Sequence, residues 1–218
     1  MTVFFMDEKK ITKLAVQKNN RQRINVFLDD EFAFGISRAA GAWLQIGQAL
    51  SQFQIDELLS KDLDETIHGK SLEYLNIRAR SEEEMRKKLQ DRGFEEDRIN
   101  SEIVHLKNSH LLDDKEFSAL WVENRNSLHP RSQRLIAYEL RRKGITEEII
   151  HDSLQDVDDD QTAFDLAFRY SKRLSNLDWQ SFRKRIGGYL ARKGFGYETI
   201  NQVTRRIWSE KEESDEDR

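Results

Sequence analysis

Apolar residues recur at helical spacing over the later two thirds of the chain, in a pattern that occurs three times. Each copy contains a glycine, at position 93, 144 or 194, so the copies are 51 and then 50 residues apart. Apolar residues four and eight positions before each glycine share one face of a helix. They are Leu89, Leu140 and Leu190, and Met85, Ile136 and Ile186. A period of this length indicates a repeated supersecondary unit.

Each copy predicts one helix before its glycine and another after it. A cation precedes each glycine, which suits the negative end of a helix, and a glycine readily adopts the left-handed conformation that ends one. After the glycine, apolar residues return at the sixth and thirteenth positions, again on one helical face. They are Ile99, Ile150 and Ile200, then Leu106, Val157 and Ile207.

Two of the copies contain a third amphipathic stretch, from Asp113 to about Asn126 and from about Asp160 to Leu174. We therefore expect two repeats of three helices and a last repeat of two. The acidic residues at 158–160 could bind a divalent cation, but at a helix start they favour a cap and a partner for the helix dipole. The expected ranges are 81–128 for repeat 1, 129–176 for repeat 2, 177–209 for repeat 3 and 210–218 for an acidic tail.

The first 50 residues alternate between apolar and polar positions, as half-buried strands do. Opposing Leu28 to Phe32 and Val26 to Phe34 requires a three-residue loop, Asp29 to Glu31, because a two-residue turn would pair Leu28 with Glu31. A short helix is expected from Ser37 to Trp43. Residues 51–80 should form connecting helices capped by Ser51 and Asp62, and a Ser81 capping box should begin the first repeat helix.

Composition supports a mainly α protein. Hydrophobic residues make up 37% and charged residues 35% of the 218, with one proline and no cysteine. Disulfides and thiolate metal sites are therefore excluded, and no apolar run reaches the ~20 residues of a membrane span. We expect a cytoplasmic monomer without a membrane segment. Its expected fold is a set of tandem three-helix repeats in an elongated curved array, with a small N-terminal β-hairpin or meander.

No motif nominates a catalytic group. The chain has no phosphate-binding loop, no zinc-protease motif and no nucleophile elbow, and its five histidines lack metal-ligand spacing. Carboxylates are abundant but alternate with Lys and Arg at helical spacing, as on a solvated helix face. We predict no enzyme activity, no cofactor and no metal site.

Basic residues interleaved with aromatic ones are the main candidate for function. Residues 177–209 contain 7 Lys and Arg against 2 Asp and Glu, whereas 210–218 contain 2 against 6. The tail could serve solubility or could mask the basic repeat. Basic helix faces suit a phosphate backbone or an acidic protein groove, although a solvated surface is the alternative. The candidates are Arg131, Arg134, Tyr138, Arg141, Arg142, Lys143, Arg183, Lys184, Arg185, Tyr189, Arg192, Lys193, Arg205 and Arg206.

Three segments resemble RecX, the family of regulatory proteins of the RecA recombinase. They are residues 25–35 (NVFLDDEFAFG), 111–117 (LLDDKEF) and 139–145 (ELRRKGI). The resemblance extends over nearly the whole chain, and the N-terminal strands are similar to those of the longer, Gram-positive-type members.

The resemblance implies a function. It implies a curved array of three-helix repeats that binds in the groove of the RecA filament on single-stranded DNA and restrains filament growth, ATP hydrolysis, strand exchange and repressor co-cleavage. The strand inside the filament is a further expected partner. The alternative is an autonomous DNA-binding protein with helix-turn-helix-like units, against which the net charge of -4 argues.

Overall fold

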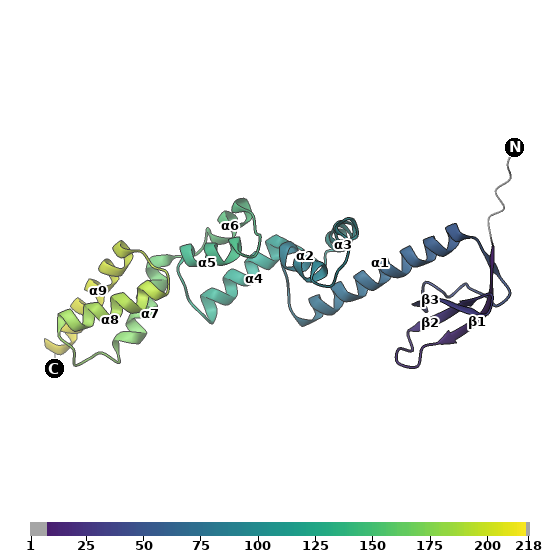
Figure 1. The fold of residues 1–218 in the computed structure, drawn as a ribbon. Helices are drawn as coiled ribbons and strands as arrows, with labels where there is room; N and C mark the ends of the chain where they lie inside the picture. Colours follow the sequence, from purple (N-terminus) through teal and green to yellow (C-terminus); the bar gives the residue numbers. More distant parts are fainter. Residues whose placement is uncertain (1–7, 217–218) are drawn as a thin grey trace. The chain divides into compact units, whose positions relative to one another are not determined.

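The computed structural model describes residues 8–216, which divide into two compact units. One unit contains the chain up to Arg78 together with Arg86–Asn108, and the other contains Ala79–Met85 and the chain from Ser109 onward. Four strands come first, followed by helices throughout the rest of the described residues (Figure 1). The mainly α fold with a small N-terminal sheet is therefore confirmed.

The first unit opens with a four-stranded antiparallel sheet of order β3-β2-β1-β4. The expected meander is formed by β1 (Lys9–Val16), β2 (Arg23–Leu28) and β3 (Glu31–Ser37). A short fourth strand, β4 (Ala49–Leu50), pairs with the start of β1 and was not expected. The inward residues form a core with the first helix, made of Ile11, Val26, Leu28, Ile36, Leu44, Leu50, Ile55 and Leu58.

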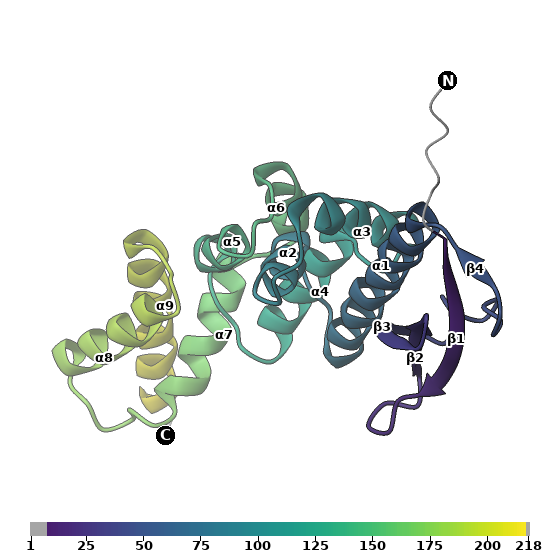
Figure 2. The ribbon, with the colours of Figure 1, turned by 45° about the vertical axis from the view of Figure 1, so that its right-hand side comes forward.

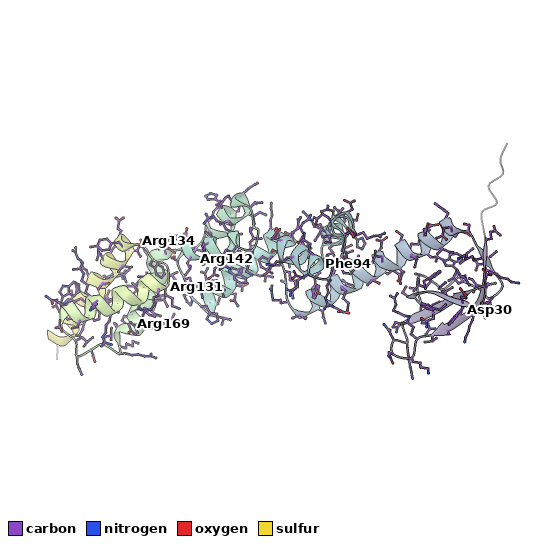
Figure 3. The ribbon with its side chains drawn as sticks, in the orientation of Figure 1. Asp30, Phe94, Arg131, Arg134, Arg142 and Arg169 are labelled. Carbon is purple, nitrogen blue, oxygen red and sulfur yellow. The ribbon has the colours of Figure 1, made fainter. Side chains whose placement is uncertain are left out.

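The turn between β2 and β3 differs from the expected one. Leu28 pairs with Glu31, so the loop has only two residues, Asp29 and Asp30. Both have positive φ, 49° and 70°, as a type I′ turn requires. Such turns match the twist of the flanking strands, and Asp tolerates this conformation. The three-residue loop was therefore wrong; Figure 3 labels Asp30 at this tip.

A register shift between β2 and β3 keeps the apolar face of the hairpin on the core side despite the two-residue turn. Val26 still pairs with Phe34, as expected, but Phe27 pairs with Phe32, so Ala33 is an extra residue in β3. Because of the shift between Val26 and Phe27, the residues of β3 that follow Ala33 again place their apolar side chains on the face that packs against the core. Phe27 and Phe32 then meet edge to face with their ring centroids 5.9 Å apart.

A single helix, α1 (Gln52–Ile77), replaces the expected connecting helices. Ser51 caps it through a capping box with Gln54, as predicted. Asp62 lies inside the helix instead of capping a second one. It is buried, and its carboxylate accepts hydrogen bonds there from the Arg23 side chain and from the Ser37 backbone. Residues 38–43 form turns, so the short helix expected there is wrong.

Eight further helices follow in the described chain, and the glycines end their helices as predicted. Gly93, Gly144 and Gly194 have φ of 82°, 79° and 94°. At each, the next residue donates to the carbonyl five positions back, which completes a Schellman motif. The helices are α2 (Glu82–Gln90), α3 (Glu96–Asn108), α4 (Asp114–Ser127), α5 (Gln133–Arg141), α6 (Glu147–Leu154), α7 (Asp159–Ser171), α8 (Trp179–Arg192) and α9 (Tyr197–Glu216).

The helices of the second unit group differently from the expected repeats. One core joins α4, α5 and α6 through Phe117, Val122, Ile136, Leu140, Ile150 and Leu154. A separate core joins α7, α8 and α9 through Ala163, Leu166, Phe182, Ile186, Leu190, Val203 and Ile207. Both groups are visible in Figure 2. The helix placed third in each expected repeat is the first of the next group.

This grouping corrects the expected boundaries. The ranges 81–128 and 129–176 each cut through a packed group, and the last group contains three helices instead of the two expected in 177–209. In addition, α9 continues to Glu216, so most of the expected tail at 210–218 extends that helix. Residues 217–218 of the tail lie outside the described residues. We call α4–α6 the middle repeat and α7–α9 the last repeat.

At two junctions along the second unit, a serine donates a hydrogen bond to the carbonyl of the lysine that precedes a helix-ending glycine. The Ser81 hydroxyl donates to the Lys143 carbonyl at 2.6 Å, and the Ser132 backbone N–H donates to the Lys193 carbonyl at 3.0 Å. Thus the start of one helix meets the glycine end of a helix about 60 residues later. Cβ atoms added at Gly144 and Gly194 would overlap Glu83 and Ser132, respectively.

An aspartate completes each junction. The backbone N–H of Glu82 donates to Asp114 at 2.8 Å, and that of Gln133 donates to Asp159 at 2.7 Å. Burial raises the pKa of the Asp159 carboxyl, although its hydrogen bond with Gln133 acts in the opposite direction. Each aspartate therefore satisfies a free N–H in the first turn of the neighbouring helix.

Candidate interaction surface

Arg131 lies before α5 and does not extend the basic face of that helix. Its guanidinium forms an ion pair with Glu139, which Arg125 also contacts at 2.7 Å. The Trp121 indole N–H donates to the same carboxylate at 2.9 Å. Arg131 therefore belongs to a partly buried network that connects α4 to α5, in which it shares the Glu139 carboxylate with Arg125.

Arg141 is also paired. Its guanidinium makes two hydrogen bonds to Glu147, of 2.5 and 2.9 Å. The hydrogen bonds raise the pKa of Arg141 and lower that of Glu147. This pair bridges the end of α5 to the start of α6, and both groups are exposed.

Lys143 is mostly buried and contacts neighbouring side chains. Its Nζ lies 2.6 Å from Glu84 and 4.1 Å from the centre of the Trp121 ring, and its side chain is only 16% exposed. A lysine that is both paired and covered by an aromatic ring is poorly placed to meet a partner. It instead supports the junction at its own carbonyl.

Three of the α5 candidates remain accessible. Arg134, Tyr138 and Arg142 are four residues apart in turn and are all exposed. Neither arginine side chain makes a hydrogen bond or ion pair within residues 8–216, although Arg142 lies 6.0 Å from the Tyr138 ring centre. Figure 3 labels both arginines. We call this set the α5 face.

In the last repeat, three candidates pack inward or are paired. Tyr189 stacks on Tyr170 with a centroid distance of 4.5 Å, and the Lys193 amine lies 5.9 Å from the Tyr189 ring centre. Arg206 lies 4.0 Å over Phe164 and donates to Glu210. These residues support packing among α7, α8 and α9.

The other cations of the last repeat are exposed. Lys184, Arg185 and Arg192 have no side-chain hydrogen bond or ion pair within the described residues. Arg169 on α7, a cation absent from the candidates above, is also exposed and makes no side-chain hydrogen bond or ion pair in the described chain; it is labelled in Figure 3. These cations are free to bind an anionic partner.

Arg183 and Arg205 lie beside Tyr197 and Asn201, two residues that sequence reasoning missed. Arg183 contacts the Asn201 side chain at 3.5 Å. The hydrogen bond from Asn201, followed by the positive charges of Arg183 and Arg205, lowers the pKa of Tyr197. The i, i+4, i+8 spacing of Tyr197, Asn201 and Arg205 was the signal that could have revealed the cluster.

The described residues contain no group of three His, Asp or Glu placed to hold a metal ion. Within the same part of the chain, no helix has the length and apolarity needed to cross a membrane. The accessible candidates of the middle and last repeats are therefore basic and aromatic side chains.

Family models identify the class. The N-terminal domain model of regulatory protein RecX matches residues 9–50, and the models of its first, second and third three-helix domains match residues 69–106, 113–154 and 158–204. The last two ranges agree with the packed groups α4–α6 and α7–α9. The chain belongs to the RecX family of regulatory proteins.

Comparisons with individual relatives support the same family assignment. The chain is similar to regulatory protein RecX of Bacillus licheniformis, with 32% identity over 88% of this chain and 74% of the relative. It is also similar to that of Clostridium perfringens strain 13, with 31% identity over 91% and 96%. A crystal structure of a regulatory protein RecX matches 90% of this chain and 99% of its own, with a TM-score of 0.68 and 25% identity. A Lactobacillus salivarius RecX structure shares the fold, with a TM-score of 0.60 and 24% identity.

Proposed function

We propose that this protein binds the RecA filament on single-stranded DNA and restrains its growth, its ATPase, strand exchange and co-protease activities. Membership of the RecX family, with matches in all four domains, is the observation that carries the proposal. In this proposal the protein acts in the cytoplasm as a monomer, without catalysis or cofactor.

The contact surface we propose consists of the accessible basic candidates together with Tyr138. They are the α5 face and, in the last repeat, Arg183, Lys184, Arg185, Arg192 and Arg205. The remaining candidates, Arg131, Arg141, Lys143, Tyr189, Lys193 and Arg206, hold helices together or are already paired. Long-range attraction between exposed cations and an acidic filament surface or DNA phosphates would speed association and would weaken with salt.

The ATPase of preformed filaments tests the proposal. Adding this protein at substoichiometric amounts should lower the rate of ATP hydrolysis, because one bound regulator affects several neighbouring subunits of a polymer. An unchanged rate at equimolar protein would contradict it.

A binding assay separates the alternative. An autonomous DNA-binding protein would bind duplex DNA alone tightly at physiological salt, with a steep salt dependence. Our proposal predicts that tight binding requires the recombinase.

A further inference from the structure

A groove of about 650 Å³ lies between α8 and α9 in the last repeat. One wall carries Trp179, Arg183 and Lys184 of α8, and the other carries Tyr197 and Asn201 of α9. None of the described residues that line it is Asp or Glu. The groove therefore combines positive charge with aromatic rings, and no carboxylate stands among the described residues that line it.

The groups around Tyr197 are donors for an anion. On α9, Tyr197 contributes a hydroxyl and Asn201 an amide, and Arg183 of α8 contributes a guanidinium group from the opposite wall. Arg205 does not line the groove, but its positive charge acts on Tyr197. The hydrogen bond with Asn201 and the positive charges of Arg183 and Arg205 lower the pKa of Tyr197, as expected where donors and cations surround one oxygen. Tyr197 is 74% exposed, so its ring and hydroxyl are accessible. A phosphate is an anion that such a set of donors can bind.

The floor of the groove is formed in part by Gly187 and Gly188, which lie inside α8. Cβ atoms added there would come no closer than 3.6 Å to Ile200 or Arg192, an ordinary contact, so packing does not require either glycine. Paired glycines destabilise a helix interior relative to alanine. Their advantage is a bare backbone surface that a ligand can approach closely.

We propose that this groove binds a nucleotide of single-stranded DNA, with a phosphate on Arg183, Tyr197 and Asn201 and a base on the glycine floor near Trp179. Single-strand binding sites in general combine a positive groove with aromatic rings on which bases stack. An acidic peptide would satisfy the cations but has no planar group for the floor.

This inference deepens the proposed function and rests on it only for the choice of ligand, the strand inside the recombinase filament. Its test contains no recombinase. Failure of the test would remove the groove as a nucleotide site and leave filament binding untouched.

The test measures fluorescence anisotropy of a labelled oligothymidylate of about 12 nucleotides at low salt. Gly188→Leu fills the floor without removing a charge, and Arg183→Gln removes one phosphate donor. Each should raise Kd about tenfold, the range expected for one base stack or one charged contact. Gly188→Leu should not lower the melting temperature, because leucine favours a helix more than glycine does.

Matched controls lie outside the groove. Gly69→Leu makes the same change inside α1, where an added Cβ meets nothing within 4 Å, and Arg173→Gln removes an exposed cation of the same repeat. Both should bind like the wild type. The proposal is overturned if Gly188→Leu and Arg183→Gln also bind like the wild type, or if the wild type fails to bind.

Two further probes identify what the groove recognises. An oligonucleotide of the same length without bases should bind more weakly, and polyglutamate should compete poorly. Equal binding of the abasic strand would mean that phosphate alone is recognised. Equal competition by polyglutamate would point to an acidic protein partner, and either result would overturn the nucleotide site.

Discussion

The hydroxyl of Ser81 donates a 2.6 Å hydrogen bond to the carbonyl oxygen of Lys143, 62 residues further along the chain. The hydroxyl also accepts from the Glu84 backbone N–H, so one side chain caps α2 and holds the end of α5. Ser132 and Lys193 make the corresponding contact through the Ser132 backbone. Successive repeats are therefore joined by helix ends, where backbone groups lack partners inside their own helix.

The glycines at these ends should differ in their sensitivity to substitution. Gly194→Ala should lower the free energy of unfolding by about 2 to 4 kcal/mol, since a positive φ costs about 1 kcal/mol and overpacking adds 1 to 3. An added Cβ would lie 2.5 Å from the Ser132 hydroxyl and 2.6 Å from Leu135. Urea unfolding followed by circular dichroism measures the change.

Gly93→Ala is the matched control. Gly93 has the same helix-end conformation, with φ of 82°, but an added Cβ meets nothing within 4 Å. Its loss should be limited to about 1 kcal/mol. Equal losses at the two positions would show that the junction is not tightly packed.

Ser81→Ala should destabilise the second unit by about 1 to 2 kcal/mol. It removes a helix cap and leaves the Lys143 carbonyl without this donor. Ser127→Ala provides the comparison, because Ser127 is an exposed residue of α4. A melting temperature of Ser81→Ala equal to that of Ser127→Ala would argue against the junction.

Asp159 should give the protein a distinctive pH dependence. Burial raises its pKa in the folded state above the ordinary value of 3.8. The folded state then binds more protons than the unfolded state, so this group's contribution to stability falls as the pH rises past 3.8. Asp159→Asn keeps an oxygen for the Gln133 N–H and should be at least as stable as wild type at pH 7, an advantage that disappears in acid.

Asp178 should behave in the opposite way. It caps α8, and hydrogen bonds from the Ser181 backbone and side chain lower its pKa. Its contribution is therefore present above its ordinary value of 3.8 and is lost as the pH falls. Asp178→Asn should lose stability at neutral pH but not in acid. Parallel pH profiles for the two variants would refute both assignments.

Local patterns predicted most helices, because a helix depends on residues close in sequence. Leu140 and Gly144, for example, predicted the end of α5. The same patterns did not reveal which helices share a core. Phe117 packs with Ile136 across a helix boundary that sequence spacing had assigned to different repeats. The predicted three-residue hairpin loop was also wrong. The extra residue, Ala33, follows from the pairing of the strands and not from the sequence of either strand alone.

The sequence indicated which residue types could form the candidate surface, but it did not indicate which of their side chains are exposed and unpaired. Lys143 and Arg192 look alike in sequence, yet the lysine is covered by Trp121 and paired with Glu84, which lies 59 residues earlier. Arg192 is exposed and has no such pair among the described residues. Contacts over this separation cannot be read from helical periodicity.

Charge reversal of Arg185, Arg192 and Arg205 together should weaken filament binding by roughly tenfold or more at moderate salt, because three attractive charges become repulsive. Helicity should change little, since the three side chains make no hydrogen bond or ion pair in the described chain. Reversal of Lys18, Arg21 and Arg38, which are exposed in the N-terminal unit, changes the net charge equally and should have less effect. Loss of helicity in the first variant, or equal binding by both, would count against the proposed surface.

Co-sedimentation with the recombinase tests the central claim most directly. The protein is mixed at physiological salt with RecA filaments assembled on single-stranded DNA, and in parallel with the same DNA alone. Our account predicts that most of the protein pellets with the filaments and that little accompanies bare DNA. Protein that stays in the supernatant with filaments present would contradict it.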